Sequence, residues 1–574
     1  MTNNTNHQPI PKRWRIHHLI PNHIDRALVE FSPLMRQLLY NRSLTTHEAA
    51  ASFVDGTVNF PTDPFLLKDM EAAVARLHSA IVNKENITIY GDYDADGVTS
   101  SALLSEFLAD LGASARVYIP NRYDEGYGLN EEAIRQLADE GTNLIITVDC
   151  GIRAIPEVTL ASQLGMDVMI TDHHHPREQL PPALAVINPR QPGDTYPDKN
   201  LAGVGLAYKL AQAYLEQFPQ EGVDVSRYVD LVAIGTVADL APLKGENRML
   251  VKAGLARIRT QPRQGIFSLA QVARIDLTRC DATNIGFGLG PRLNAAGRLD
   301  SALTAFELLT TENEMTAGEL AQALDSQNSQ RQDMTQYIRE EAAARVLTED
   351  PEAILFFAAA PEFSPGVVGL AASRLAEAYY RPAIIAYQGD EFTVASCRSI
   401  PEFHITQALD SCADLLVRHG GHAAAAGFTV CNENLPELIT ELKRIAQDVL
   451  DDVPLMPVLD IDREIKLHKL SPNYIPGILD DLNQLEPTGR ENPEPVFASR
   501  NIDVRQARTV GREGDHLKLT LQAGRNTFDG IAFRQGYWAK DMPDQIDIAY
   551  RFEINEFMGR SNLQLNIKDI KPAT

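Results

Sequence analysis

The sequence predicts a multidomain α/β protein whose first large domain is built on a parallel sheet. Short, apolar, β-rich runs alternate with helical stretches between residues 81 and 240, which is the pattern of a parallel α/β sheet. The alternation begins again at residue 351, and a pattern with a period of two residues follows in 455–574. A chain of 574 residues is also too long for one hydrophobic core, so three or four domains are expected.

The domain organisation follows from these changes of pattern. A long polar, amphipathic helix is predicted between the two α/β regions, and helices of this kind often bridge two domains. The period-two runs at the end of the chain indicate half-buried strands of an antiparallel β-barrel. In chain order we expect a partly helical lead-in, a main α/β domain, the connecting helix, a second α/β domain and the barrel, over residues 1–80, 81–310, 311–350, 351–454 and 455–574.

The composition argues against several classes of protein. The net charge is −24, from 53 basic and 77 acidic residues, which argues against a protein that coats or packages nucleic acid. It remains compatible with an enzyme that contacts phosphate through local basic positions. No apolar run is long enough for a membrane span, and the polar N-terminus lacks the apolar core of a signal peptide. Five scattered cysteines without a C-x-x-C pair predict a reducing, cytoplasmic location without disulfides or structural zinc.

The turn Tyr90–Gly97 is the most informative segment of the chain. It carries three alternating aspartates, Asp92, Asp94 and Asp96, directly after an apolar strand and before a predicted helix. Carboxylates this close repel one another and favour their neutral forms. A bound divalent cation removes that conflict, and clusters of oxygen ligands suit Mg²⁺ or Mn²⁺. An acidic turn alone is usually just solvated, so the prediction depends on what the rest of the chain supplies.

Similar polar groups follow three further apolar runs. Asp149 follows the run 144–148, Asp172 and three histidines follow 168–171, and Asp239 closes a run over 231–238. Ligands of parallel α/β sheets bind outside the carboxyl ends of the strands. The side chains expected to converge at that edge are Asp94, Asp96, Asp149 and His173.

Each aspartate also has a structural interpretation. An aspartate at the end of a strand often caps the following helix, and this would be the better interpretation of Asp149 or Asp239 taken singly. The four sites together favour a metal centre. One imidazole among carboxylates shifts the expected metal from Mg²⁺ toward Mn²⁺, and several carboxylates can hold two ions for hydrolysis of a phosphate ester. The sequence contains no Gly-x-Ser-x-Gly elbow and no Walker loop, so acyl transfer and ATP use are not indicated.

These motifs resemble those of a known superfamily. The segments Gly91–Gly97, Val148–Gly151 and Asp172–His174, with the later Asp239, resemble the successive motifs of the DHH phosphoesterases. The segment Gly420–Gly427 resembles the glycine-rich signature of the DHH-associated domain. The order of the domains, with Asn121–Gly128 and Gly290–Arg298, resembles the bacterial exonucleases of this superfamily that degrade single-stranded DNA. The likeness covers nearly the whole chain.

The resemblance implies a function. Such enzymes degrade single-stranded DNA from the 5′ end, release 5′-mononucleotides, require Mn²⁺ or Mg²⁺ and act in repair and recombination. It also implies an OB-fold for the C-terminal barrel and a monomeric protein. A single-strand-binding protein and a helicase are the partners expected from the family's role.

The resemblance assigns roles to the polar residues. Asp149 would bridge two ions, and Asp92 would be a ligand or lie just behind the ligands. Asp172 and His174 would orient the ligands or contact the scissile phosphate, whereas His175 is open to a purely structural role. Related phosphatases have histidine where this chain has Tyr90, so one metal site would lack an imidazole and bind its ion weakly. The implied metal ligands are Asp94, Asp96, Asp149, His173 and Asp239.

Recognition of a 5′ end needs a pocket for the terminal phosphate. Arginine grips phosphate with two parallel hydrogen bonds, and glycine lets backbone N–H groups approach it. The candidates are Arg122, Arg292, Arg298, Ser396, Arg398, Gly421 and His422. Each arginine has a surface ion pair as its alternative, since acidic partners are plentiful. In the barrel, a stripe of basic residues (Arg500, Arg505, Arg508, Arg512, Lys518 and Arg525) is a candidate DNA surface, with Tyr537 available for stacking, whereas Trp538 and Phe552 fit the core better.

Two other functions remain open from the sequence. A DHH phosphodiesterase of short RNA or cyclic dinucleotides would use the same motifs, but such enzymes usually stop after the associated domain, and the barrel argues for a longer polymer. A catalytically inactive scaffold that binds DNA or replication proteins is the alternative of a different class. The intact set of acidic motifs argues against the scaffold, because binding alone needs no convergent, self-repelling carboxylates.

Overall fold

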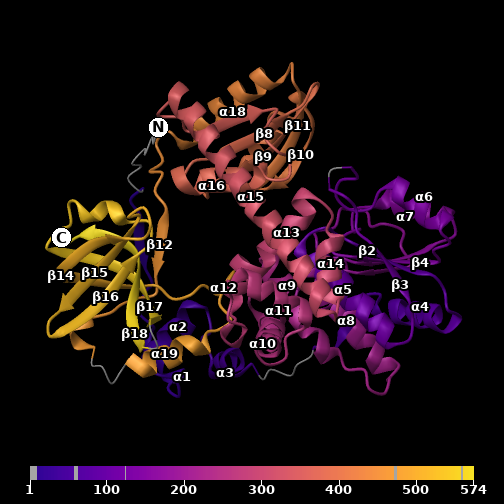
Figure 1. The fold of residues 1–574 in the computed structure, drawn as a ribbon, viewed down its shortest axis with the longest axis horizontal. Coiled ribbons are helices and arrows are strands. Elements are labelled where there is room, and N and C mark those ends of the chain that lie inside the picture. Colours follow the sequence, from indigo (N-terminus) through magenta and orange to yellow (C-terminus); the bar gives the residue numbers. More distant parts are fainter. Residues whose placement is uncertain (1–9, 57–61, 123, 471–474, 558–559, 574) are drawn as a thin grey trace. The chain divides into compact units, whose positions relative to one another are not determined.

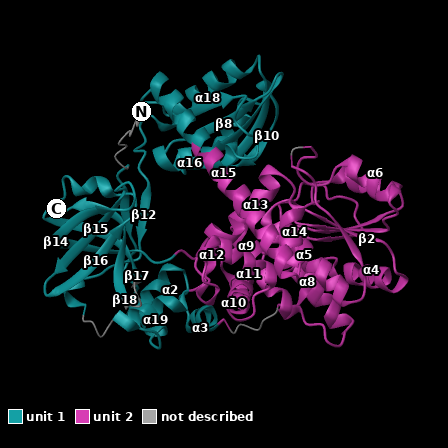
Figure 2. Cartoon of the chain, viewed as in Figure 1, with its two compact units in different colours: residues 1–55, 337–485, 494–574 teal, residues 56–336, 486–493 magenta. Residues whose placement is uncertain are grey.

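The computed structural model describes residues 10–56, 62–122, 124–470, 475–557 and 560–573. The chain, drawn in Figure 1, forms two compact units, which Figure 2 shows in different colours. Unit 1 comprises residues 1–55, 337–485 and 494–574, and unit 2 comprises residues 56–336 and 486–493. Both units therefore contain segments that are distant in the sequence.

Unit 2 contains the predicted parallel sheet. Its five strands all run parallel, in the order β3 (Ala115–Tyr118), β2 (Ile87–Gly91), β4 (Leu144–Val148), β5 (Asp167–Thr171) and β6 (Ala185–Ile187). The two central strands, β2 and β4, are buried along their whole length. Continuous apolar runs are what a strand covered on both faces requires.

Helices cover both faces of this sheet (Figure 1). One face packs on α4 (Met70–Asn83), α5 (Ala95–Asp110) and α8 (Gly203–Gln217), and the other on α6 (Glu131–Asp139) and α7 (Ile155–Gln163). Alternate residues of β4 serve the two layers: Leu144 and Ile146 join the core with α5 and α8, whereas Ile145 joins the core with α6 and α7.

A helical region completes unit 2. The apolar run before Asp239 forms α9 (Val229–Ala238), which is buried on all sides and packs on α5 and α10. A π-helical turn, Ile285–Leu289, leads directly into α13. The other helices of this region are α10 (Gly245–Thr260), α11 (Gln264–Ala273), α12 (Ala282–Asn284), α13 (Gly290–Leu299) and α14 (Leu303–Thr310).

The predicted connecting helix is confirmed as α15, a single helix of 36 residues over Glu314–Glu349. The boundary between the two units falls within it, after Gln336. Within the described residues, none of the helices is both long enough and apolar enough to cross a membrane.

The second α/β domain, in unit 1, is also confirmed, although its sheet is mixed. The strand order is β10 (Leu416–His422), β11 (Ala425–Cys431), β9 (Phe392–Arg398), β8 (Ala383–Gln388) and β7 (Phe356–Ala360). Only β7 and β8 pair in parallel, and the other neighbours are antiparallel. The accompanying helices are α16 (Val368–Tyr379), α17 (Ile405–Asp410) and α18 (Leu435–Leu450).

The C-terminal barrel is confirmed as a closed five-stranded structure. Its strands follow the order β14 (Phe497–Val510), β15 (His516–Ala523), β16 (Asn526–Ala532), β18 (Arg560–Pro572) and β17 (Gln545–Phe557). Pairing of β14 with β17 closes it, and one contact, β16 with β18, is parallel. Along β15 every second residue is buried, as the period-two pattern predicts.

The N-terminal region contributes to the same core. Strand β1 (Arg13–Ile16) pairs in parallel with β12 (Val458–Ile461). Residues of α2 such as Leu38 and Leu39 pack in one hydrophobic cluster with barrel residues. The remaining elements around the barrel are α1 (Asn22–Ala27), α2 (Pro33–Asn41), α3 (His47–Asp55), β13 (Arg463–Glu464) and α19 (Ile475–Gln484). Helix α4, by contrast, belongs to unit 2.

Candidate metal centre and phosphate-binding residues

The turn between β2 and α5 places three aspartates at the carboxyl end of a central strand. Asp94 is the N-cap of α5, and its side chain accepts hydrogen bonds from the backbone N–H groups of Asp96 and Gly97. Asp96 is buried and accepts from Gly203 N at 2.7 Å and Val204 N at 2.8 Å, at the start of α8. Helix N-termini stabilise carboxylates, so α8 holds Asp96 in place.

Asp149 follows β4 in a strained backbone conformation. Its φ is +61°, in the left-handed region that side chains other than glycine rarely adopt. The residue is 2% exposed, and a methyl group added to Gly203 would lie 2.7 Å from its Cβ, so only glycine fits there. Strain of this kind persists where the surrounding structure enforces a functional orientation.

The Asp172–His175 segment follows β5. Asp172 is fully buried and accepts hydrogen bonds from Ile152 N and from the His174 ring, whose Nδ1 lies 2.8 Å from Asp172 Oδ1. His173 Nε2 lies 3.1 Å from Asp149 Oδ1, 3.8 Å from Asp239 Oδ2 and 4.0 Å from Asp96 Oδ2. The residue after them, His175, accepts a hydrogen bond from Arg153 through its carbonyl oxygen.

The ligands predicted from the sequence therefore converge, although Asp239 is positioned by a helix and not by a strand. Asp239 ends helix α9 instead of following a strand of the sheet. Three groups of side chains each bring their ligand atoms within 4.8 Å of one another: Asp92, Asp94 and Asp149; Asp96, His173 and Asp239; Asp149, His173 and His174. Asp149 and His173 each belong to two of these groups.

The electrostatics of the cluster favour a bound cation. Burial and the neighbouring carboxylates raise the pKa of Asp96 to about 7 and that of Asp239 to about 9, and raise the pKa of Asp92 and Asp149 well above its usual range. Burial lowers the pKa of His173 to about 4, so its imidazole is neutral at physiological pH, the form that binds metals.

Three buried polar atoms in the cluster have no hydrogen-bond partner among the described residues. They are Asp92 Oδ1, and also Asp149 Oδ1 and His173 Nε2, which lie 3.1 Å apart without forming a hydrogen bond. Buried polar atoms are nearly always satisfied, and the capacity to bind an ion is one of the accepted explanations for an exception. Carboxylate oxygens with one imidazole nitrogen suit Mn²⁺ and, with fewer nitrogen ligands, Mg²⁺. The donor set therefore fits the metals expected from the sequence.

Asp172 and His174 form a pair at the rim of the cluster. Burial alone would raise the pKa of Asp172, but the hydrogen bond and charge of His174 lower it on balance. The same contact outweighs burial at His174 and raises the pKa of the imidazole. His174 is the more exposed of the two histidines in the cluster, with 40% of its side chain accessible against 11% for His173. A solvent-facing, protonatable imidazole can contact a phosphate.

Tyr90, which replaces the histidine of related phosphatases, is directed elsewhere. It is fully buried, and its hydroxyl donates a hydrogen bond to Gly128 O at 3.1 Å. It belongs to the core under α6 and α7. The described residues supply no imidazole in its place, since neither histidine-containing group includes Asp92 or Asp94.

Two of the predicted phosphate-binding arginines lie beside the metal loop, as we call the turn between β2 and α5 that carries Asp92, Asp94 and Asp96. The Arg122 guanidinium lies 5.1 Å from the centre of the Tyr93 ring. Gly297 packs against the Tyr93 carbonyl oxygen, which brings the next residue, Arg298, to the same loop. Burial, followed by the charges of Arg122 and Arg331, lowers the pKa of Arg298 to about 10. The charges of Arg122 and Arg331 thus both act on Arg298, and such a gathering of positive charge is a favourable environment for an anion.

The remaining candidates differ in their surroundings. Arg292 is in an ion pair with Asp325, at 2.8 Å, and also donates to Gly288 O. Ser396 and Arg398 are in unit 1 on β9, where both approach Gly369 in the first turn of α16: a methyl group added to Gly369 would lie 3.3 Å from Ser396 Oγ and 3.2 Å from Arg398 Nη2. Gly421 and His422 are exposed at the end of β10, in the same unit.

Several residues of the site were not predicted. Arg331 lies on α15 and donates to Asn328, three residues earlier on the same helix face. Asn294 accepts a hydrogen bond from Ala95 N at 2.8 Å and so ties α13 to the metal loop. Tyr127 is 54% exposed and donates to Asp149 O at 3.3 Å. Both Asn294 and Tyr127 lie inside motifs that are recognisable in the sequence, 290–298 and 121–128, whereas Arg331 carries no local signal.

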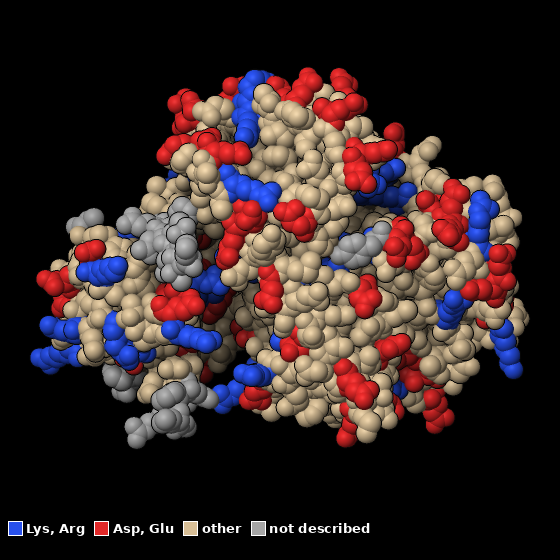
Figure 3. Space-filling model, turned by 45° about the horizontal axis from the view of Figure 1, so that its top comes forward, with Lys and Arg blue, Asp and Glu red and all other residues tan. Residues whose placement is uncertain are grey.

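The barrel residues fall into two classes. Phe552 is buried and Trp538 packs against the barrel core, whereas Tyr537 is 38% exposed. Within the predicted basic stripe, Arg500 is paired with Glu464 and Asp547. Figure 3 shows basic side chains gathered over the barrel, whereas acidic ones are more frequent elsewhere on that face.

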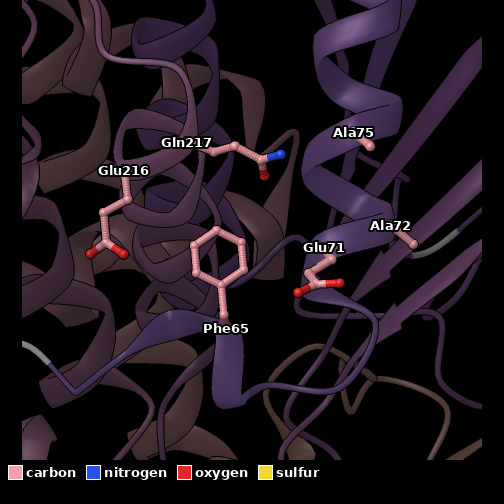
Figure 4. Close-up of a pocket in the computed structure, with 6 residues that line it drawn as sticks. All are labelled: Phe65, Glu71, Ala72, Ala75, Glu216 and Gln217. Carbon is pink, nitrogen blue, oxygen red and sulfur yellow. The ribbon is translucent and has the colours of Figure 1, made fainter.

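An open pocket of about 760 Å³ lies away from these residues, between α4 and α8 (Figure 4). It is lined by Phe65, Glu71, Ala72, Ala75, Glu216 and Gln217. None of the sequence-predicted site residues lines it, and its two carboxylates have no basic or imidazole partner in the lining.

Comparison with known proteins agrees with this organisation. Three family models match successive parts of the chain: the DHH family N-terminal domain at residues 86–236, the DHHA1 domain at 352–448 and the RecJ OB domain at 461–569. The match to the last of these identifies the barrel as an OB domain.

Full-length relatives extend the match to nearly the whole chain. The single-stranded-DNA-specific exonuclease RecJ of Bacillus subtilis is 38% identical over 564 residues, which are 97% of this chain and 70% of the relative. Its Escherichia coli counterpart is 35% identical, over 95% of this chain and 96% of the relative. The crystal structure of Thermus thermophilus RecJ with Mn²⁺ matches with a TM-score of 0.83 and 31% identity, over 98% of this chain and 80% of that one. A structure of that protein with Mg²⁺ gives a TM-score of 0.78.

Proposed function

The chain belongs to the RecJ family of single-stranded-DNA-specific exonucleases, and on this basis we propose that it degrades single-stranded DNA from the 5′ end and releases 5′-mononucleotides. As a family member it is a metal-dependent hydrolase of phosphodiester bonds that acts in DNA repair and recombination. One observation carries the assignment to this chain's own residues. Carboxylates from three separate segments meet the His173 imidazole, and three of the buried ligand atoms have no hydrogen-bond partner among the described residues.

The metal ligands that we propose are Asp94, Asp96, Asp149, His173 and Asp239, with Asp92 as a further candidate. Asp149 belongs to two groups of potential ligands, which supports its assignment as the bridge between two ions. These residues would hold Mn²⁺ or Mg²⁺, which would supply an activated water molecule for attack and neutralise charge on the phosphodiester. The group that lacks an imidazole, Asp92, Asp94 and Asp149, would hold its ion more weakly than the group around His173.

The protein's own residues then complete the chemistry. The Asp172 carboxylate holds His174 through its ring nitrogen and raises the pKa of the imidazole, so that a protonated His174 can donate to a phosphate oxygen or to the departing 3′ oxygen. Asp96, held by two backbone N–H groups of α8, and Asp149, fixed by its strained backbone, keep the ligand positions rigid before substrate arrives.

We propose two candidate sets of contacts to the 5′-terminal phosphate, each within one unit: Arg122 and Arg298 in unit 2, and Ser396, Arg398, Gly421 and His422 in unit 1. The repulsion of the Arg298 guanidinium by Arg122 and Arg331 supports the first pair, because a bound anion would relieve it. Arg398 is half-buried without an ion pair among the described residues, and it lies with Ser396 over the first turn of α16, where anions are favoured. Arg292 has the weakest support, because Asp325 already neutralises it.

The expected partners follow from the same reaction. A helicase would generate the single strand and a single-strand-binding protein would hold it, so we propose both as partners, and a monomeric, cytoplasmic enzyme. The OB domain supports a long-polymer substrate, because such domains track the backbone of single strands.

The proposed function is tested by digesting a long single strand and the matching blunt duplex with Mn²⁺, with Mg²⁺ and with EDTA. Loss of the single strand to mononucleotides, with the duplex spared and EDTA abolishing the reaction, is the expected result. Cleavage confined to very short oligomers would indicate a small-substrate phosphodiesterase. Binding of DNA without cleavage under any divalent metal would indicate an inactive scaffold.

A further inference from the structure

An eight-residue segment between α19 and β14, Glu486–Pro493, is built into unit 2, although the residues on either side of it belong to unit 1. Its backbone pairs with the turn that follows α9: Leu243 N donates to Arg490 O at 2.9 Å. The Arg248 side chain donates to Glu486 O and to Pro487 O. These contacts fix the segment to the region that carries the metal-site residue Asp239.

The side chain of Arg490 reaches the end of α9. Its Nη1 donates to the carbonyl oxygen of Leu240 at 3.2 Å, one residue after Asp239. Leu240 has a φ of +58°, so the chain turns sharply at this point and presents that carbonyl to the guanidinium. Arg490 itself is solvent-exposed. Its charge acts directly on Asp239, where it opposes the effect of burial on the pKa of that carboxyl.

The second arginine is Arg190, which lies far from Arg490 in the sequence, just after β6. Asn188 accepts from Arg190 N at 2.8 Å and donates to His174 O at 2.9 Å, which ties Arg190 to the metal-site histidines. The Arg190 guanidinium donates to Lys199 O and Asn200 Oδ1. Beyond the effect of burial, the groups whose charges act on its pKa are Asp239, Arg490 and Asp172.

These two arginines therefore lie together at Asp239. Neither is in an ion pair within the part of the chain that the structure describes. Two guanidinium groups beside a carboxylate ligand oppose the binding of a cation there, so they do not help to build a metal site. Their placement is favourable when an anion approaches the cluster, since arginine grips phosphate oxygens.

We propose that Arg190 and Arg490 form a second phosphate contact, which binds the DNA backbone on the 3′ side of the scissile bond. This inference rests on the proposed function. Arg122 lies over the Tyr93 ring, and the charge of Asp94 acts on the pKa of Arg298, so this pair lies at the Tyr93–Asp94 side of the cluster. Arg190 and Arg490 lie at Asp239 instead. With the terminal phosphate at the first pair and the scissile bond at the carboxylates, the next phosphate reaches the second pair.

The inference is tested with Arg490→Gln on a set of single strands in which one phosphate at a time, counted from the 5′ end, is a neutral methylphosphonate. On unmodified DNA we expect kcat/KM to fall about tenfold, the usual loss for one charge-assisted hydrogen bond. On the strand whose contacted phosphate is neutral, the variant and the wild type should differ by less than about twofold, because the same contact is already absent. Arg490→Lys, which keeps the charge, should lose less than Arg490→Gln.

The matched control is Arg135→Gln, an exposed arginine on α6 whose ion-pair partner is Glu131. It should behave as the wild type on every strand. A tenfold loss in Arg490→Gln that is the same on every strand, with weaker Mn²⁺ binding in calorimetry, would overturn the inference and show that Arg490 only holds the Asp239 turn. Wild-type protein that leaves all the strands intact would instead contradict the proposed function itself.

Discussion

The two α/β sheets of this protein present opposite charges at their strand ends. In unit 2 every strand is parallel, and β2, β4 and β5 deliver aspartates and histidines to one edge. In unit 1 the sheet is parallel only between β7 and β8, and the end of β9 carries Ser396 and Arg398 at the first turn of α16. Parallel strands bring groups from distant parts of the sequence into one place, here the candidate cation site. The mixed sheet brings one polar pair to a helix N-terminus, which suits an anion.

The largest effect is expected from Asp149, the centre of the cation site. Asp149→Ala should reduce hydrolysis by about a thousandfold or more, as the loss of a central electrostatic group in an active site does. Asp149→Asn should be similarly inactive while tolerating the left-handed backbone, since asparagine adopts that conformation readily. Circular dichroism would verify the fold of both variants. Retained Mn²⁺-dependent cleavage in either variant would refute the metal assignment.

Asp172 supports the cation site through His174 and should have a smaller effect. The charge of Asp172 holds the His174 imidazole and raises its pKa, and Asp172→Asn removes that charge. Activity should therefore fall about 10- to 100-fold, the usual range for partners of metal-site residues. The alkaline limb of the pH–rate profile should also move to lower pH. A variant with an unchanged profile would show that His174 does not act as a proton donor.

The metal-free protein should lose stability as pH rises. Burial raises the pKa of Asp96 to about 7 and of Asp239 to about 9, so the folded state binds more protons than the unfolded state, whose aspartates ionise near their ordinary values. The stabilising effect of these protons is complete at acid pH and is lost as pH rises through 7 and toward 9. Thermal unfolding in EDTA between pH 5 and pH 9 measures it. Added Mg²⁺ should raise the Tm more at the alkaline end, and an equal gain at every pH would show that these carboxylates do not hold the ion.

The candidate anion site at Ser396 and Arg398 is tested by comparing substitutions of Arg398 and Arg292. Arg398→Gln should raise KM about tenfold for strands with a 5′ phosphate, in line with one charge-assisted hydrogen bond, and have little effect on strands with a 5′ hydroxyl. Arg292→Gln should instead cost stability, because it leaves Asp325 without its partner, and should not distinguish the two kinds of end. If Arg292→Gln affects strands with a 5′ phosphate more than strands with a 5′ hydroxyl, and Arg398→Gln affects both equally, the assignment of Arg398 to the terminal phosphate is wrong.

The smallest effect is expected at the barrel surface. Arg508→Gln should weaken binding of long single strands about two- to threefold, and the slope of log affinity against log salt concentration should become shallower by about 0.7 if the arginine neutralises one phosphate. Cleavage of short strands should be unchanged. Deleting residues 455–574 is a poor substitute for this experiment, because that deletion would also remove Glu486–Pro493 from unit 2 and the core partners of the N-terminal helices. Unaltered binding of long strands would remove Arg508 from the DNA surface.

Most of the cation site could be predicted from the sequence. Apolar runs followed by Asp94, Asp149 and Asp172 mark strand ends, and in a parallel sheet these must lie at one edge. The run before Asp239 is equally apolar but forms α9, since a run buried on all sides has no periodicity to distinguish helix from strand.

The arginines were harder to assign, because their role depends on partners that are distant in the sequence. Arg292 and Arg298 lie on the same helix, yet only the first meets Asp325, on α15. Arg331, Arg190 and Arg490 carry no local motif at all. The placement of Glu486–Pro493 in unit 2 is likewise a tertiary effect, visible only through its hydrogen bonds to Leu243 and Arg248.

The most direct test of the central claim is Mn²⁺-dependent digestion of one long single strand, labelled at its 5′ end in one sample and at its 3′ end in another. We expect immediate release of a labelled mononucleotide from the 5′-labelled strand, and late release of the 3′ label. Early release of the 3′ label, or internal cuts that yield labelled fragments of many lengths from both strands, would contradict the claim.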